Sequence, residues 1–162
     1  MSTMTTKTDI PQDLDTRVLA RILEEGYGPG AWHGADLKAA IADVPSELAF
    51  WRPSPTRHNI AEIALHHAYY VHDVRGRLSG QDPGAFVAEG EDWFAVSGAS
   101  EMAWPVIVET VEREQAALVD FVTSRSARQL DKEGFSLVLG ITCHAAYHAG
   151  QVQLLKKLAE ER

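Results

Sequence analysis

The spacing of apolar residues constrains the fold of this chain more than any other feature. From Asn59 to Leu78, apolar side chains recur every three or four positions, which places them on one face of an α-helix. Three further long segments repeat this pattern: Leu14 to about residue 25, about 101–124 and about 137–161. A shorter segment covers about 36–42, and no segment predicts a strand. Four long amphipathic helices predict an all-α four-helix bundle.

Length and composition indicate one globular unit. The chain has 162 residues, which is enough for a core of its own. We expect residues 1–12 to be a flexible leader and residues 13–162 to form a single domain. The predicted helices are joined by short loops, except for a long, irregular connection from about residue 79 to 100. We expect Trp93 and Phe94 to pin this connection to the bundle, and long loops of this kind are often functional.

Charge and cysteine content exclude several classes of function. The net charge of −8 argues against binding to nucleic acid, which requires a basic surface. No apolar run reaches the ~18 residues that a membrane span needs, and the N-terminus lacks the apolar core of a signal peptide. Cys143 is the only cysteine, so no internal disulfide is possible. We therefore expect a cytoplasmic protein.

Two histidines on the last predicted helix point to chemistry. His144 and His148 are four residues apart and therefore one turn apart on the same helix face. That face is otherwise apolar, and a buried imidazole without a partner is costly. Neutral imidazole is a good ligand for first-row transition metals, so the pair is a candidate for part of a metal site. A pair packed in the core or on the surface is the alternative.

A third ligand would have to come from a neighbouring helix. The segment 59–78 offers His66, His67 and His72. Periodicity places His67 at the centre of the apolar face and His66 about 100° to one side. The spacing thus favours His67 slightly, but His66 remains possible because a site in a cleft can lie at the edge of such a face. The sequence contains neither the His-Glu-x-x-His motif of zinc proteases nor the Glu-x-x-His motif of di-iron bundles.

Three sequence elements together resemble the DinB-like superfamily of metal-binding four-helix proteins. They are 28–34 (GPGAWHG), 59–66 (NIAEIALH) and 144–151 (HAAYHAGQ), in this order and across most of the chain. The last element is the most specific. The resemblance implies an up-down-down-up bundle, which fits the long connection after the second long helix. It also implies a metal site of His66, His144 and His148, with water or substrate completing the coordination, and it places a hydrophobic position where His67 stands.

Several other residues have possible roles near such a site. Gln151 shares the face of the histidine pair and is a candidate to orient one of them, while Glu62 is a candidate acceptor for the second ring nitrogen of His66 or a solvated residue. His33 is a candidate acid or base at the pocket mouth. We expect His58 and His72 to face solvent or begin a helix, Tyr147 to be a packed aromatic residue, and Gly150 to permit close helix approach.

The predicted function is divalent-metal binding in a pocket. Ligation by nitrogen alone suits zinc or nickel, with iron or manganese possible. Characterised relatives include transferases that use a low-molecular-weight thiol, so such an enzyme or a hydrolase is one hypothesis; Arg52, Arg57 and Arg75 are candidates to hold the cosubstrate. A non-catalytic, stress-related metal or small-ligand binder is the other. A homodimer is a further hypothesis, with Trp51, Tyr69 and Phe86 as candidates for its interface.

Overall fold

The computed structural model describes residues 15–98, 102–124 and 130–161. The predicted leader, residues 1–12, lies outside these ranges. The described residues form helices and no strand, which confirms the predicted all-α class. The helices are α1 (Thr16–Tyr27), α2 (Leu37–Ile41), α3 (Ser46–Phe50), α4 (Ile60–Ser79), α5 (Trp104–Thr123) and α6 (Lys132–Glu160).

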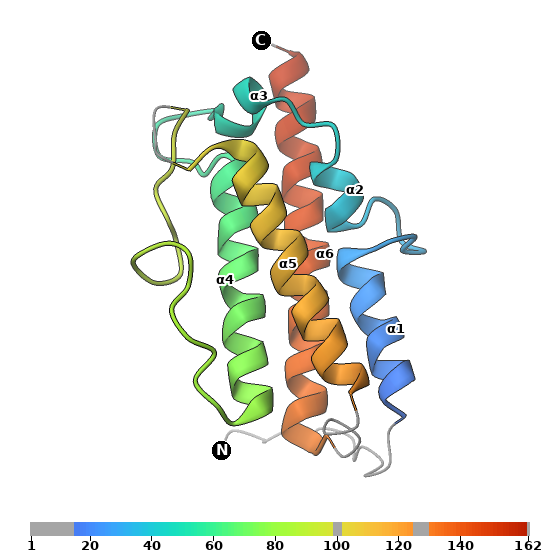
Figure 1. Cartoon of the computed structure of the whole chain (residues 1–162). Coiled ribbons are helices and arrows are strands. Elements are labelled where there is room, and N and C mark those ends of the chain that lie inside the picture. Colours follow the sequence, from blue (N-terminus) through green and yellow to red (C-terminus); the bar gives the residue numbers. More distant parts are fainter. Residues whose placement is uncertain (1–14, 99–101, 125–129, 162) are drawn as a thin grey trace, which may run out of the picture.

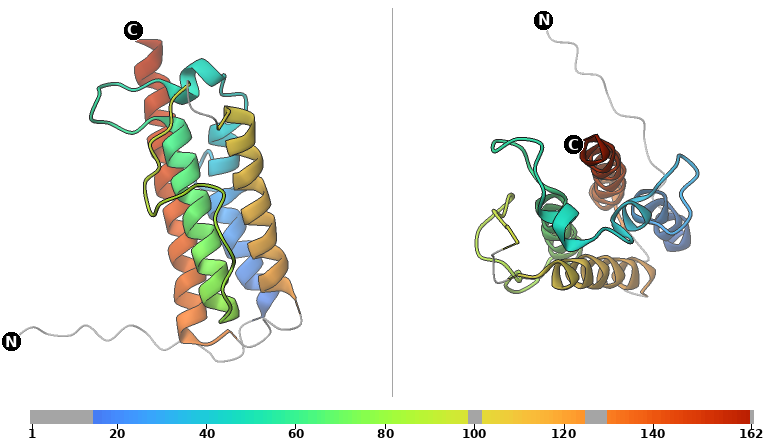
Figure 2. Two further views of the ribbon diagram at one scale, coloured as in Figure 1. Left: turned by 60° about the vertical axis from the view of Figure 1, so that its left-hand side comes forward. Right: turned by 90° about the horizontal axis from the view of Figure 1, so that it is seen from above.

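The long helices α1, α4, α5 and α6 lie side by side, and the short helices α2 and α3 lie toward one end (Figure 1). In Figure 1, α1 and α6 run upward, whereas α4 and α5 both run downward. Because α4 and α5 point the same way, the link between them must return along the length of the bundle, and Figure 2 shows it doing so on the outside of α4. The link therefore covers a face that would otherwise be open.

Side-chain caps fix where the long helices begin. Asn59 accepts a hydrogen bond from the backbone N–H of Glu62, and Glu62 accepts one from that of Asn59, so that α4 starts with a capping box. Asp15 caps α1 by accepting a hydrogen bond from the backbone N–H of Arg17. Asp131 caps α6, which therefore begins five residues before the predicted start at Leu137.

The apolar faces meet in two clusters of buried side chains. One cluster, toward the α2–α3 end, includes Ile60, Ile107 and Val152. The other includes Leu19, Val71 and Leu118, from α1, α4 and α5. The three aromatic residues suggested for a dimer surface, Trp51, Tyr69 and Phe86, are instead partly buried against the first cluster. No described helix is both long and apolar enough to cross a membrane.

The link between α4 and α5 is attached to α4 at several points. Val96 donates its N–H to Glu62 and its carbonyl accepts from the side chains of Asn59 and Arg52. Phe94 is buried and Trp93 packs against the same core, as expected for residues that pin the link. These contacts satisfy buried backbone groups that a loop would otherwise leave unpaired, and they hold residues 92–96 in place beside His66.

Candidate metal centre

Three histidines from two helices converge on one point. His66 comes from α4, and His144 and His148 come from α6. The Nε2 atom of His144 lies 3.1 Å from Nε2 of His66 and 3.1 Å from Nε2 of His148. Two nitrogens on one tetrahedral zinc, each at about 2.0–2.1 Å from the ion, are about 3.3 Å apart. Two of the three nitrogen pairs therefore have nearly this spacing, and all three ligand atoms lie within 4.8 Å of one another.

The outer nitrogens of two of these rings face acceptors. Nδ1 of His66 lies 2.8 Å from the backbone carbonyl of Asp92 and 3.2 Å from its carboxylate. Nδ1 of His148 lies 2.6 Å from Oε1 of Gln151, whose amide also donates to the hydroxyl of Tyr147. Because a carbonyl cannot donate, Nδ1 of His66 must carry the proton. Gln151 thus contacts His148.

The outer nitrogen of the third ring, Nδ1 of His144, faces His67. His67 is fully buried, and its Nδ1 lies 3.2 Å from Nδ1 of His144. His67 is therefore not a member of the converging group; it lies behind His144, at the centre of the apolar face, as its periodicity predicted. Its own Nε2 makes no hydrogen bond of normal geometry to any described side chain.

The tautomers that these contacts favour leave lone pairs facing one another. With protons on Nδ1 of His66 and His148, both Nε2 atoms of these rings are bare. If His144 likewise donates from Nδ1 to His67, a third lone pair joins them. Three lone pairs within 4.8 Å of one another repel unless a cation lies between them. The donor set thus fits a divalent metal ion, and its outer contacts are those that orient metal-binding histidines.

The environment of the cluster favours neutral imidazoles. Burial, together with the neighbouring His148 and His66, lowers the pKa of His144 to about 3. Burial also lowers the pKa of His148 to about 4, although the hydrogen bond that His148 donates to Gln151 acts in the opposite direction, and burial lowers the pKa of His66. The pKa of His67 falls well below its usual value, chiefly because it is buried. Neutral imidazole is the form that binds metals.

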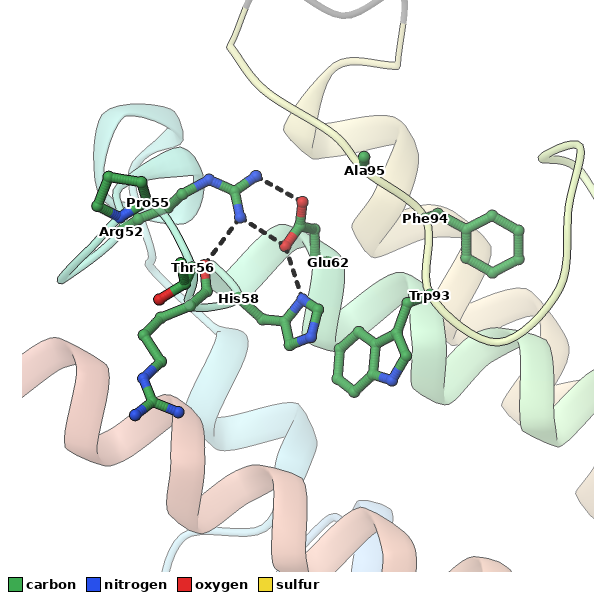
Figure 3. A pocket seen from close by; sticks show the side chains of 9 residues that line it. Arg52, Pro55, Thr56, His58, Glu62, Trp93, Phe94 and Ala95 are labelled. Atoms are coloured by element: carbon green, nitrogen blue, oxygen red, sulfur yellow. Dashed lines mark hydrogen bonds and ion pairs between the residues drawn. The ribbon is translucent and has the colours of Figure 1, made fainter.

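Trp93 forms one wall of the site. Its indole is stacked between two imidazoles, with ring centroids 3.9 Å from His66 and 3.7 Å from His58 (Figure 3 shows His58 and Trp93 together). Tyr70 approaches His66 edge-on and donates its hydroxyl to the carboxylate of Asp92. Sequence periodicity gave no information on these contacts, because the irregular link supplies Asp92 and Trp93.

Glu62 has a different role from the one suggested by its spacing. Its carboxylate is buried and accepts hydrogen bonds from Arg52 at 2.5 Å and 2.8 Å and from His58 at 3.0 Å, rather than from His66 (Figure 3). Burial alone would raise the pKa of Glu62, but the hydrogen bonds from Arg52 and His58 lower it below its ordinary value. This ion pair anchors the loop before α4 and the link to the start of that helix.

The structure does not bring His33 to the cluster. Its exposed ring bonds to the carbonyl of Glu25, and the loop that carries it projects from the α1 side of the bundle, away from the link (Figure 2). His58 does precede a helix, but His72 is buried between Glu114 and the carbonyl of Gly84 instead of facing solvent. Tyr147 is exposed rather than packed.

Close approach of two helices occurs at Gly26 and not at Gly150. A Cβ atom on Gly150 would meet nothing within 4 Å, whereas one on Gly26 would lie 2.3 Å from the backbone oxygen of Thr142. Glycine at position 26 therefore sets the separation of α1 from α6. It positions the helix that carries His144 and His148.

Comparison with known proteins agrees with this site. The DinB superfamily matches residues 31–152, which include all three converging histidines. The chain belongs to the DinB superfamily. Proteins of the DinB superfamily are generally metal-binding, and the cluster of His66, His144 and His148 is the part of this DinB-like chain that could hold a metal ion. No curated protein and no solved structure matches the chain.

We expect His67→Leu to weaken zinc binding by about ten- to a hundredfold while leaving one site per chain. Leucine removes the contact that holds the ring of His144 but keeps the buried volume apolar. Competition with a colorimetric chelator measures the affinity, and elemental analysis measures the stoichiometry. If His67 were instead a ligand, stoichiometric binding would be lost; if it only filled space, the affinity would not change.

Proposed function

We propose that this DinB-superfamily chain is a divalent-metal-dependent enzyme that activates a small thiol, or alternatively water, for attack on a small electrophilic substrate. The three imidazoles of His66, His144 and His148 would hold the ion. The observation that carries the proposal is the number of ligands. Among the described residues, no fourth histidine, cysteine or carboxylate joins the group of three.

A closed set of four protein ligands is typical of structural zinc sites, whereas three ligands and an open position are typical of catalytic ones. When bound, a divalent ion with an open position lowers the pKa of a coordinating water or thiol and so supplies a nucleophile near neutral pH. Ligation by imidazole alone favours zinc or nickel over magnesium or calcium, and iron and manganese are further candidates.

The surrounding residues would prepare the site for this chemistry. Asp92 and Gln151 fix the rings of His66 and His148 in the tautomer that presents Nε2. The carboxylate of Asp92 also places one negative charge beside His66, which would partly offset the charge of a cation held by the three neutral imidazoles. Trp93 shields one side of His66 from water. We assign the helix directions seen in Figure 1 to the up-down-down-up order of DinB-like bundles, in which α4 and α6 supply the ligands.

The test compares thiol transfer and hydrolysis in one preparation. For thiol transfer, the zinc- and nickel-loaded proteins are incubated with monochlorobimane together with one thiol at a time: glutathione, cysteine or coenzyme A. For hydrolysis, they are incubated with p-nitrophenyl acetate. We expect metal-dependent turnover at least tenfold above the rate without protein in one of the two assays. His148→Ala should abolish it, because that variant removes a ligand.

Cys143→Ser is the necessary control. Cys143 is an exposed thiol that can react with bimane by itself, so this variant must retain full turnover for the metal to be credited. Metal bound at one ion per chain, with no turnover of any thiol or ester, would contradict the enzymatic proposal. The chain would then be a non-catalytic metal or small-ligand binding protein.

A further inference from the structure

A cleft adjoins the histidine cluster, and the metal site does not explain why exposed leucines and an arginine line it. Its volume is about 490 Å³, within the range of about 300–1,000 Å³ that is usual for small-molecule sites. The loop before α4, the link and the last turns of α6 form its walls. Two of its lining residues also contact the cluster: Trp93 stacks on His66, and Gln151 accepts from His148. A molecule in the cleft would therefore lie next to the imidazoles.

One wall of the cleft is aliphatic and open to water. Leu154 and Leu158 on α6 line it with 57% and 38% of their surface exposed, and Leu155 and Ile63 extend the wall inward. Exposed leucines that line a concavity are unfavourable in water unless something covers them. The indole of Trp93 presents only its edge, because its two faces are covered by His58 and His66. The wall thus fits an aliphatic group better than a stacked aromatic ring.

The loop before α4 contributes to the cleft a cation without a carboxylate partner. Arg57 lines the cleft, and it is the one arginine among the described residues with no carboxylate oxygen within ion-pair distance. All the others have one at 3.9 Å or closer: Arg17, Arg21, Arg52, Arg75, Arg77 and Arg113. The chain has a net charge of −8, so acidic partners are plentiful.

The neighbouring carboxylate does not oppose an anion here. Glu62 does not line the cleft but lines an adjoining cavity of about 450 Å³ (Figure 3), which shares Arg57, His58 and Trp93 with it. Arg52 and His58 bond to its oxygens, so its charge is compensated. Arg57 lines both cavities and remains available to an external anion. A guanidinium binds a carboxylate through two parallel hydrogen bonds, which gives orientation as well as affinity.

We propose that this cleft binds an aliphatic carboxylate, with the carboxylate on Arg57 and the hydrocarbon chain on Leu154 and Leu158, as the substrate class of the adjoining site. That it is a substrate rests on the proposed function, whereas the binding itself does not, because the cleft is formed by the protein alone. The ligand's chain would run along α6 toward Gln151, which places its far end beside the histidine cluster.

The test is isothermal titration of octanoate into the full chain after removal of metal by a chelator, so that direct coordination of the carboxylate cannot contribute. We expect one octanoate per chain, at least tenfold weaker binding for Arg57→Gln and for Leu154→Gln, and no binding of octylamine. Arg113→Gln is the matched control, because Arg113 lies on α5, is paired with Glu114 and does not line the cleft. This control should bind octanoate like the parent.

Three results would overturn the inference. One is the absence of octanoate binding in a chain that still binds zinc, which would leave the proposed function standing. Another is equal binding by Arg57→Gln. The third is a dimer that Leu154→Glu converts to a monomer in light scattering, with octanoate having no effect, because a second copy of the chain would then cover the leucines. If the chain bound octanoate but no metal ion, only the proposed function would be rejected.

Discussion

Replacing His144 by alanine should weaken zinc binding by several hundredfold. Nε2 of His144 is the middle member of the cluster, 3.1 Å from each of the other two Nε2 atoms. Structural zinc sites with four ligands bind with about 10–16 kcal/mol, or about 2.5–4 kcal/mol per ligand. Loss of one ligand should therefore weaken binding by roughly a hundred- to a thousandfold, which is more than the ten- to a hundredfold effect expected for His67→Leu. Chelator competition at pH 7.5 measures both variants on one scale.

His33→Ala is the matched control for this experiment. It removes the same side chain from an exposed loop position outside the cluster, so its zinc affinity should equal that of the parent. The His144→Ala protein also loses a partner of the buried His67, so circular dichroism must establish that it is folded. Equal affinity of His144→Ala and His33→Ala would show that zinc binds elsewhere.

Gly26→Ala should destabilise the fold by about 2–4 kcal/mol, although it adds only a methyl group. The new Cβ would lie 2.3 Å from the oxygen and 2.9 Å from the Cα of Thr142. These are backbone atoms of α6 and cannot rotate away, so α1 must move out and loosen the packing of Leu23 and its neighbours. Urea denaturation of the metal-free protein, followed by circular dichroism, measures the change in the free energy of unfolding.

Gly140→Ala should change the free energy of unfolding in the opposite direction in the same assay. Gly140 is also helical, but it is exposed and a Cβ there would meet nothing within 4 Å. Alanine should stabilise α6 by about 0.5–1 kcal/mol because glycine is a poor helix former. If both glycine variants gave the same small change, the contact between α1 and α6 would not be as close as the structure has it.

Periodicity predicted the helices because each long helix buries one apolar face. It also predicted the relation of His144 to His148, which depends only on the helical turn. It did not choose between His66 and His67, because the central position on the apolar face belongs to the more buried residue. His67 is that residue, and the cluster lies at the edge of the apolar face of α4, where His66 points toward the link. Resemblance to the family, not spacing, selected His66.

Contacts between segments far apart in the sequence were not predictable. Arg52 and Glu62 meet only because the loop before α4 folds back, and Asp92 reaches His66 from an irregular link with no periodicity to read. The start of α6 was placed too late because its first turns, after Asp131, lack the apolar spacing of the later ones. A capping aspartate three residues before Gly134 was the available signal.

The proposed function depends on three imidazoles that hold one divalent ion and leave a coordination position open. X-ray absorption spectroscopy of the chain loaded with one equivalent of zinc tests it most directly, because the spectrum reports the number and type of atoms bound to the metal. We predict three imidazole nitrogens and one exchangeable light atom, with one ion per chain. A fourth protein ligand, or a protein that takes up no ion from zinc or nickel solutions, would contradict the proposed open metal site.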